Sequence, residues 1–196
     1  MALIAAVAAI EGSDERSDTI AAARAGDLAA FELLMRQNER LVLATALRLT
    51  GNMEDAQDIS QEVFPRLYKN LGKVKAEAAL PAWLYRVTVN ACHDLRRRRP
   101  ASAPVETAGE LVASGTDAQT SLTEAERRRV LEMSLRILPE KERAALVLRD
   151  LEGLSTEEVA RALGSSEATV RSQVSKARAK VHDFVERYFA PRRRRQ

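Results

Sequence analysis

The sequence has few of the residues on which catalysis and disulfide bonding usually depend. It contains two histidines and one cysteine among 196 residues. No internal disulfide can form, and a reducing cytoplasm is the expected setting. Cys92 and His93 are neighbours but are too few ligands for a zinc site. Phosphate-loop, nucleophile-elbow and zinc-protease motifs are missing from the sequence. We therefore expect a protein that is not an enzyme and that has no cofactor or metal.

Aromatic residues and long apolar runs are also scarce. Only 4% of residues are aromatic, whereas 45% are hydrophobic and 30% are charged. Residues 1–10 are apolar but too short to span a bilayer, and they lack a basic start, so we expect neither membrane insertion nor secretion. Alanine, leucine, arginine and glutamate dominate, and apolar residues recur with a helical period. These features predict an all-α protein.

One stretch interrupts the helical pattern. Residues 100–120 are rich in Ala, Ser, Thr, Gly and Pro and have no sustained apolar period, which is typical of a flexible linker. The sequence therefore divides into an N-terminal extension, a first helical domain, this linker, a second helical domain and a basic tail: residues 1–17, 18–99, 100–120, 121–190 and 191–196.

The net charge of +3 is small, but the positive charges are concentrated. Residues 96–99 and 192–195 are two blocks of four arginines. Such blocks attract polyanions such as nucleic acid, and the simpler alternative is that they only increase solubility.

The first domain has three stretches of helical periodicity. Asp27 and Asn52 precede the first two and suit the N-cap position, and Pro81 suits the first turn of the third. Pro65 lies inside the second stretch, where loss of a backbone hydrogen bond predicts a kink. Apolar residues every three or four positions mark the inward faces: Phe31, Leu34 and Met35; Ala56, Ile59, Val63, Leu67 and Leu71; Leu84, Val87, Ala91 and Leu95.

Polar residues occupy the opposite faces of the second and third stretches. A solvated helix surface is the simpler interpretation of both faces, and binding to a partner is the other. The second stretch has Asp58, Gln61 and Glu62, and the third has Arg86, Asn90, His93 and Arg97, preceded by a loop with Lys73 and Lys75.

The second domain ends in a pattern typical of a helix-turn-helix, over residues 154–189. Ser155 and Glu158 fit a capping box at the start of a short helix, and Gly164 can end that helix in a left-handed conformation. Ser166 suits the cap of a second, longer helix. Its inward face is marked by Val170, Val174, Ala177, Val181, Phe184 and Tyr188.

The outer face of this last helix is polar and basic. An ordinary helical hairpin with a solvated face would also show this pattern. Small residues at the start of the helix favour DNA, because they allow that end to approach a groove closely. The candidate DNA contacts are Arg171, Ser172, Ser175, Lys176 and Arg178.

Two ordered blocks of residues resemble the bacterial RNA polymerase sigma factors of the sigma-70 superfamily, extracytoplasmic-function type. Together they span most of the chain outside the extension, the linker and the tail. The first block contains Gly26, Asp27, Ala30, Phe31, residues 56–64, residues 83–87, Asn90, Asp94 and residues 96–98. The second contains Leu138, Pro139, Arg143, residues 151–155, residues 158–160, residues 169–172, Ala177 and Arg178.

The resemblance implies a division of labour between the two domains. The first domain would dock on core RNA polymerase through Asp58, Gln61 and Glu62. It would also open the promoter −10 element through Arg86, Asn90, His93, Arg97, Lys73 and Lys75. The second domain would read the −35 element, with Arg171, Ser172 and Ser175 on base edges and Lys176 and Arg178 on phosphates. The family also implies an anti-sigma partner.

Two other functions fit the residues. A stand-alone helix-turn-helix regulator would bind DNA tightly without polymerase, usually as a symmetric dimer. A helical adaptor would use its basic faces for protein partners and would show no salt-sensitive DNA binding.

Overall fold

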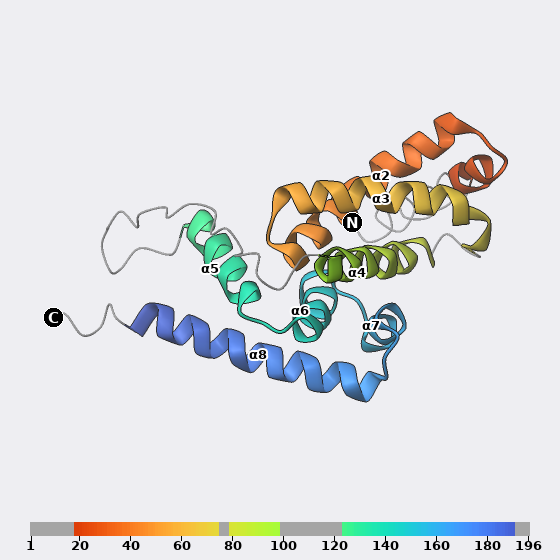
Figure 1. The fold of residues 1–196 in the computed structure, drawn as a ribbon. Helices are drawn as coiled ribbons and strands as arrows, with labels where there is room; N and C mark the ends of the chain where they lie inside the picture. Colours follow the sequence, from red (N-terminus) through yellow and green to blue (C-terminus); the bar gives the residue numbers. More distant parts are fainter. Residues whose placement is uncertain (1–17, 75–78, 99–122, 191–196) are drawn as a thin grey trace, which may run out of the picture.

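The chain folds into helices joined by short turns in a computed structural model that describes residues 18–74, 79–98 and 123–190 (Figure 1). The described residues form no strand, which confirms the predicted all-α class. The predicted extension, linker and tail, together with Lys75, lie outside the described residues. After a helical segment at residues 18–24, the elements are α2 (Leu28–Thr50), α3 (Met53–Asn70), the 3-10 turn η1 (Leu71–Lys73), α4 (Leu80–Arg98), α5 (Glu124–Arg136), α6 (Glu140–Leu146), the π-helical turn η3 (Val147–Leu151), α7 (Thr156–Leu163) and α8 (Glu167–Phe189).

Side-chain caps fix where several of these helices begin. Asp27 accepts hydrogen bonds from the amides of Ala29 and Ala30, at 2.8 and 3.1 Å. Asn52 caps α3 in the same way, by accepting from the amide of Glu54 at 2.8 Å. These bonds satisfy donors that a helix leaves unpaired in its first turn. The predicted starts of both helices are confirmed.

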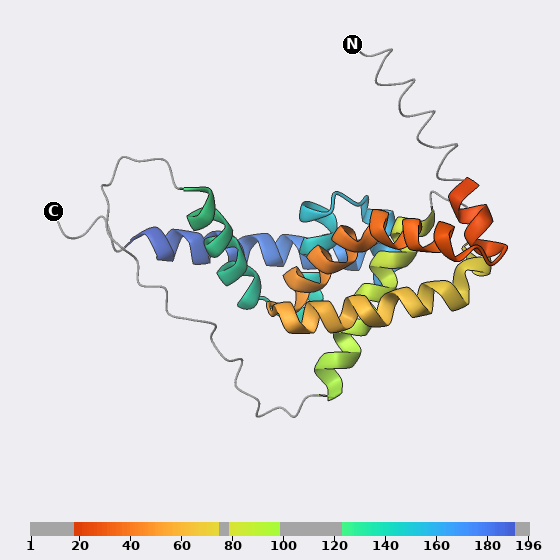
Figure 2. The same cartoon turned by 90° about the horizontal axis from the view of Figure 1, so that it is seen from above.

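The first domain packs α2, α3 and α4 around one core. The predicted α3 stripe is confirmed, since each of its members is at most 3% exposed: Ala56, Ile59, Val63, Leu67 and Leu71. Helix α3 continues through Pro65 as one helix from Met53 to Asn70 (Figure 2), and the kink at Pro65 stays a prediction. Pro65 is exposed, so its ring meets solvent and packs against nothing in the core.

The second domain packs α5, α6 and α7 against the long helix α8. Val170, Val174 and Ala177 of α8 are buried, at 0, 6 and 0% exposure. Gly164 adopts a left-handed conformation with φ 59° between α7 and α8. This conformation strains residues with a side chain and lets the chain turn sharply. The predicted helix-turn-helix is confirmed as α7, this turn and α8.

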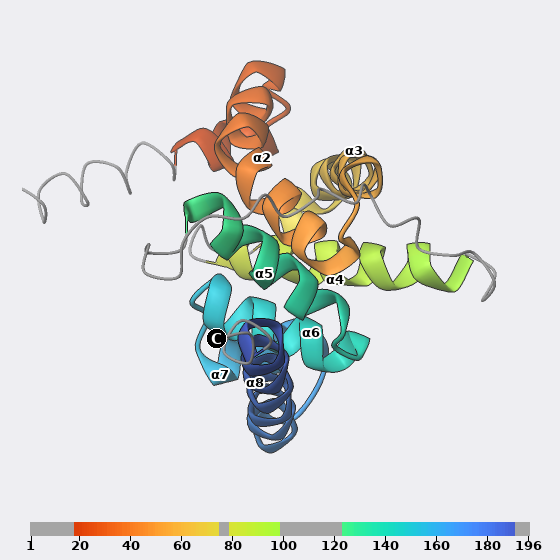
Figure 3. The ribbon, with the colours of Figure 1, turned by 90° about the vertical axis from the view of Figure 1, so that its left-hand side faces the viewer.

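The two domains lie directly against each other. In Figure 3, α2 and α3 lie above α4, and α6, α7 and α8 lie below it, while Figure 1 shows the same order from the side. Helix α4 contacts α7, and α2 contacts α5, α6 and η3. The buried apolar residues of both domains form one continuous cluster. The packing of the domains on each other thus places all candidate sites on a single body.

Candidate nucleic-acid interface

The outer face of α8 is open to solvent. The five candidate contacts on this helix are all exposed: Arg171, Ser172, Ser175, Lys176 and Arg178. They lie opposite the buried stripe because a helix turns by about 100° per residue. Two hydroxyls and three cations on one exposed helical face can contact base edges and phosphates.

Both arginines on this face are already paired with carboxylates. The Arg171 guanidinium lies 2.6 Å from Glu167, one turn earlier in the same helix. Arg178 donates two bonds to the Asp150 carboxylate, from Nε at 2.8 Å and from Nη2 at 2.7 Å. These bonds to Asp150 raise the pKa of Arg178 above its ordinary value. Arg178 therefore ties α8 to η3 as well as facing solvent.

Helix α7 is fixed by the predicted capping box, which is confirmed. The Glu158 carboxylate accepts from the amide of Ser155 at 2.7 Å, and the Ser155 hydroxyl accepts from the amide of Glu158 at 3.2 Å. The bond from the Ser155 amide lowers the pKa of Glu158. Ser166 caps α8 by accepting from the amide of Thr169 at 3.2 Å. Side-chain caps therefore fix the starts of both α7 and α8.

Helix α4 has an exposed basic face. Arg86, Asn90 and Arg97 are exposed on it, as the spacing of these residues predicts. His93 lies at the edge of this face and is only partly exposed. Its Nε2 atom lies 3.3 Å from Oε1 of Glu140 in α6. Three of the four candidates on α4 are therefore open to solvent, and the fourth contacts the second domain.

The loop before α4 contributes one described lysine. Lys73 is exposed in η1, and its ammonium donates to Oδ1 of Asn70 at 3.0 Å. Because this is a single bond at the surface, the ammonium can turn to another acceptor.

The candidate polymerase-binding face lies on α3. Asp58 and Gln61 are exposed, whereas Glu62 is partly exposed and forms an ion pair with Arg66, one turn later. The three side chains share one face, because positions 58, 61 and 62 are three or four residues apart. This face lies on a different helix from the exposed residues Arg86, Asn90 and Arg97.

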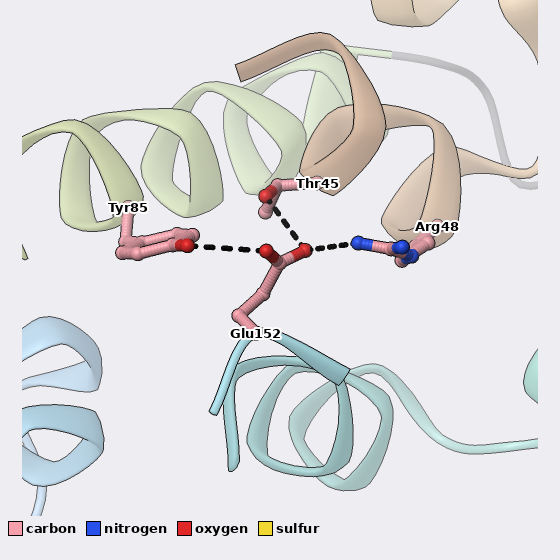
Figure 4. Close-up of polar contacts among 4 residues, drawn as sticks. All are labelled: Thr45, Arg48, Tyr85 and Glu152. Atoms are coloured by element: carbon pink, nitrogen blue, oxygen red, sulfur yellow. Dashed lines mark hydrogen bonds and ion pairs between the residues drawn. The ribbon is translucent and has the colours of Figure 1, made fainter. Parts of the chain in front are cut away.

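A cluster around Glu152 joins the two domains, although nothing in the sequence pattern predicted an interdomain role for this residue. Thr45 Oγ1 donates to Glu152 Oε1 at 3.0 Å, and Tyr85 OH donates to Oε2 at 3.1 Å (Figure 4). Arg48 forms an ion pair with the same carboxylate. Burial raises the pKa of Tyr85, and the Glu152 charge raises it further.

Arg143 makes a second connection between the domains. It is 8% exposed. Its guanidinium donates to the carbonyl of Leu49 in α2 at 2.7 Å, and to the carbonyls of Arg136 and Leu138 at 3.1 Å each. Removal from water lowers the pKa of Arg143. The side chain supplies donors to carbonyls that the ends of α2 and α5 leave unpaired.

One pattern in the sequence does indicate that α4 packs against the second domain. Tyr85, Val89 and Cys92 are spaced by four and three residues and form a second buried stripe on α4. The core stripe through Leu84 and Ala91 lies beside it. A helix with two adjacent buried faces packs against two neighbours. The apolar spacing of the sequence predicted a core position for only one of these two faces.

Two protein-family models match this chain, one in each of the two domains. The family model for Sigma-70 region 2 matches residues 34–101, and the one for Sigma-70 region 4 matches residues 128–181. The chain is 34% identical over 174 residues to the ECF RNA polymerase sigma factor SigM of Mycobacterium tuberculosis (strain ATCC 25618 / H37Rv), covering 87% of this chain and 85% of the relative. The chain belongs to the ECF RNA polymerase sigma factors. The resemblance seen in the sequence is confirmed.

Further relatives support the same family. The ECF RNA polymerase sigma-E factor of Escherichia coli (strain K12) is 31% identical over 187 residues, which cover 89% of this chain and 97% of the relative. The first domain is thus a sigma region 2 domain and the second a region 4 domain. Within the described residues, no helix is both long and apolar enough to cross a bilayer.

Solved structures share the fold of this sigma factor. CnrH, in complex with the cytosolic domain of CnrY, superposes with a TM-score of 0.63 and 26% identity, over 87% of this chain and 96% of that one. The sigma factor RpoE of Bartonella quintana, in complex with the anti-sigma factor NepR, gives a TM-score of 0.60 at 22% identity, over 77% and 96%. The second likeness concerns the fold alone.

Proposed function

We propose that this sigma factor recognises promoters with two separate helical faces. The exposed face of α8 reads the −35 element, and the exposed face of α4, with Lys73, holds the opened −10 element. The observation that carries this proposal is the solvent-exposed polar face of α8 behind a fully capped helix-turn-helix. Capping fixes the direction of the helix, and exposure leaves its side chains free to enter a groove.

No bond has to be broken chemically for the DNA to open. The protein needs a site that holds unstacked bases and basic groups that hold the backbone, so that binding energy offsets the cost of unpairing. Arg86 and Arg97 supply exposed charge on α4, and Asn90 between them supplies hydrogen-bond donors and acceptors. We assign phosphate contact to the two arginines.

Core RNA polymerase binds this sigma factor through α3 in the proposed function. Asp58, Gln61 and Glu62 present two carboxylates and an amide, which suit a basic protein surface. The side chains of Asp58 and Gln61 are exposed, which supports this role. The double variant Asp58→Ala/Gln61→Ala should weaken binding to core polymerase, whereas Glu39→Ala, which removes an exposed charge from α2, should not.

An anti-sigma factor is the expected regulator. RpoE of Bartonella quintana was crystallised with the anti-sigma factor NepR, and CnrH with the cytosolic domain of CnrY. We infer that this chain has a protein partner of the same kind, and that both proteins work in the cytoplasm.

Reconstitution with core RNA polymerase on a promoter library tests the whole proposal. We expect weak DNA binding by the free chain and selective transcription only in the presence of core enzyme. Failure to bind core, combined with tight binding to an operator by the chain alone, would instead support the stand-alone regulator. Loss of all salt-sensitive DNA binding would support the helical adaptor.

Two substitutions separate base reading from phosphate contact on α8. Arg171→Ala should change the preferred −35 sequence, by about 1–3 kcal/mol at one base pair if the arginine makes a bidentate contact. Arg178→Ala should weaken all promoters by similar factors, with a smaller salt dependence. Because Arg178 is also paired with Asp150, Asp150→Ala serves as the control for loss of that pair alone. Equal changes in Arg171→Ala and Arg178→Ala would contradict the assigned roles.

A further inference from the structure

The first residue of helix α8 carries a carboxylate that the proposed function does not use. Glu167 follows the Ser166 cap and is exposed. Its Oε2 atom accepts a hydrogen bond from Nη2 of Arg171, one turn later, at 2.6 Å. Its other oxygen, Oε1, accepts no hydrogen bond from the residues that the structure describes. A carboxylate with one oxygen open to a donor therefore lies beside the arginine that is assigned to a base edge.

The carboxylate of Glu167 is not needed to cap α8. The Ser166 hydroxyl accepts from the amide of Thr169 at 3.2 Å and lies 2.8 Å from the hydroxyl of the same threonine. In α7, by contrast, the acidic side chain of Glu158 accepts from the amide of Ser155 and completes the capping box. The start of α8 is thus fixed without Glu167, and its surface ion pair with an arginine one turn later adds little stability.

The place of Glu167 on the helix brings it close to the bases. In a helix-turn-helix, the N-terminal residues of the second helix contact base edges in the major groove. Glu167, Arg171 and Ser175 follow one another at intervals of four residues and so lie along one side of α8. All three are exposed. Because the proposed function assigns Arg171 and Ser175 to base edges, Glu167 is the next side chain along the same line toward the N-terminus.

The chemistry of the major groove decides which base a carboxylate can contact. The Arg171 guanidinium balances the charge of Glu167, and it has five N–H groups, so it can keep this ion pair and still bind a guanine. Only cytosine N4 and adenine N6 donate hydrogen bonds in the major groove. Adenine also presents the N7 acceptor beside its amino group, which repels a second carboxylate oxygen, whereas cytosine presents its amino group alone. Glu167 is therefore complementary to cytosine.

We propose that Glu167 is a specificity residue of this sigma factor and accepts a hydrogen bond from the N4 amino group of a cytosine in the −35 element. The cytosine lies within about two base pairs of the guanine that Arg171 contacts, because side chains one turn apart are about 5–6 Å apart and successive base pairs about 3.4 Å apart. The proposal rests on the proposed function, in which α8 reads the −35 element, and it adds a second base to that reading.

Selection of a randomised −35 element by the complex with core RNA polymerase tests this proposal. Core enzyme is loaded with wild type, Glu167→Gln or Glu167→Ala, and the bound DNA is sequenced. Glutamine presents a donor and an acceptor, which match N6 and N7 of adenine. We expect Glu167→Gln to change the preferred base at one position from cytosine to adenine, by about 5- to 100-fold in relative affinity. Glu167→Ala should remove the preference at that position and create no new one.

Glu157→Gln is the matched control. Glu157 is also an exposed acidic residue in the first turn of its helix, α7, and it also pairs with an arginine one turn later, Arg161, at 3.9 Å. The control removes the same charge from the same domain and should leave every base preference unchanged. An unchanged base preference in Glu167→Gln would overturn the proposal and leave the carboxylate only a favourable interaction with the helix dipole. The same change of preference in Glu157→Gln would also overturn it.

Arg171→Ala separates failure of this proposal from failure of the function on which it rests. If wild type selects a −35 sequence and Arg171→Ala changes that sequence while Glu167→Gln does not, the assignment of α8 stands and the role of Glu167 is wrong. If the wild-type complex selects no −35 sequence, the proposed function itself fails. Far-UV circular dichroism checks that Glu167→Gln is folded, as expected because Ser166 caps α8 independently.

Discussion

Substitution of Arg143 should destabilise the folded chain more than that of any exposed arginine. Its guanidinium donates to three backbone carbonyls, those of Leu49, Arg136 and Leu138, within a nearly water-free site. The carbonyls of Leu49 and Arg136 lie in the last turns of α2 and α5, where a helix leaves its acceptors unpaired. Loss of the side chain leaves those acceptors buried without a donor.

The size of the stability loss in Arg143→Ala follows from two opposing effects. A hydrogen bond from a charged donor contributes about 1.5–3 kcal/mol, but burying a guanidinium costs several kcal/mol. Removing one partner from a buried charged cluster typically destabilises by about 3–5 kcal/mol. We expect Arg143→Ala to lower the free energy of unfolding by about 3 kcal/mol. Arg143→Lys should recover less than half of this loss, because an ammonium lacks the planar fork that reaches two helix ends.

Urea unfolding followed by far-UV circular dichroism measures this effect. The control is Arg36→Ala, which removes an exposed arginine paired with Glu32 one turn earlier. Such surface pairs contribute about 0.3–0.5 kcal/mol. A loss below about 1 kcal/mol in Arg143→Ala would refute the argument that its three bonds stabilise the junction of the domains.

Four further outcomes can be checked by urea unfolding, acid titration or mass spectrometry. Ser155→Ala should lower the free energy of unfolding measured in urea by about 1 kcal/mol. The stability that the ionised Glu158 side chain contributes should be present above about pH 4.3, and it should be lost as the pH falls through the lowered pKa of this residue. If the stability of Glu158→Gln depends on acid pH in the same way as that of wild type, the capping role is contradicted. Burial raises the pKa of Cys92 to about 12. Iodoacetamide at pH 8 should therefore modify this thiol slowly in native protein and rapidly in urea, as followed by mass spectrometry. Rapid labelling of the native protein would contradict the burial of Cys92. Pro65→Ala should raise the free energy of unfolding by roughly 1–3 kcal/mol, because alanine restores the missing backbone hydrogen bond of α3; a loss of stability would show that the proline is favourable.

Much of the local structure could be predicted from short stretches of sequence. The caps at Asp27, Asn52, Ser155 and Ser166 and the turn at Gly164 lie where the sequence predicted them. Capping and left-handed turns depend on groups within about four residues, so neighbouring residues are sufficient evidence. The kink at Pro65 stays a prediction, since α3 runs through the proline as one helix.

The solvent exposure of the candidate promoter-binding faces could also be predicted from the sequence. Exposure of Arg86, Asn90 and Arg97 follows from helical spacing alone, and so does exposure of the α8 residues. Spacing did not indicate which of these side chains already have partners. The pairing of Arg178 with Asp150 joins residues 28 positions apart, and nothing in the local pattern selects that partner.

The sequence by itself determined the helices, their buried stripes and the family of this sigma factor, because these depend on periodicity and on ordered motifs. Only the tertiary structure decided how the two domains meet. Glu152 finds Thr45 across 107 positions, and Arg143 finds Leu49 across 94. Which donors converge on a buried charge depends on how whole helices pack. A carboxylate and a guanidinium that look like surface residues in the sequence thus become the polar centre of the contact between the domains.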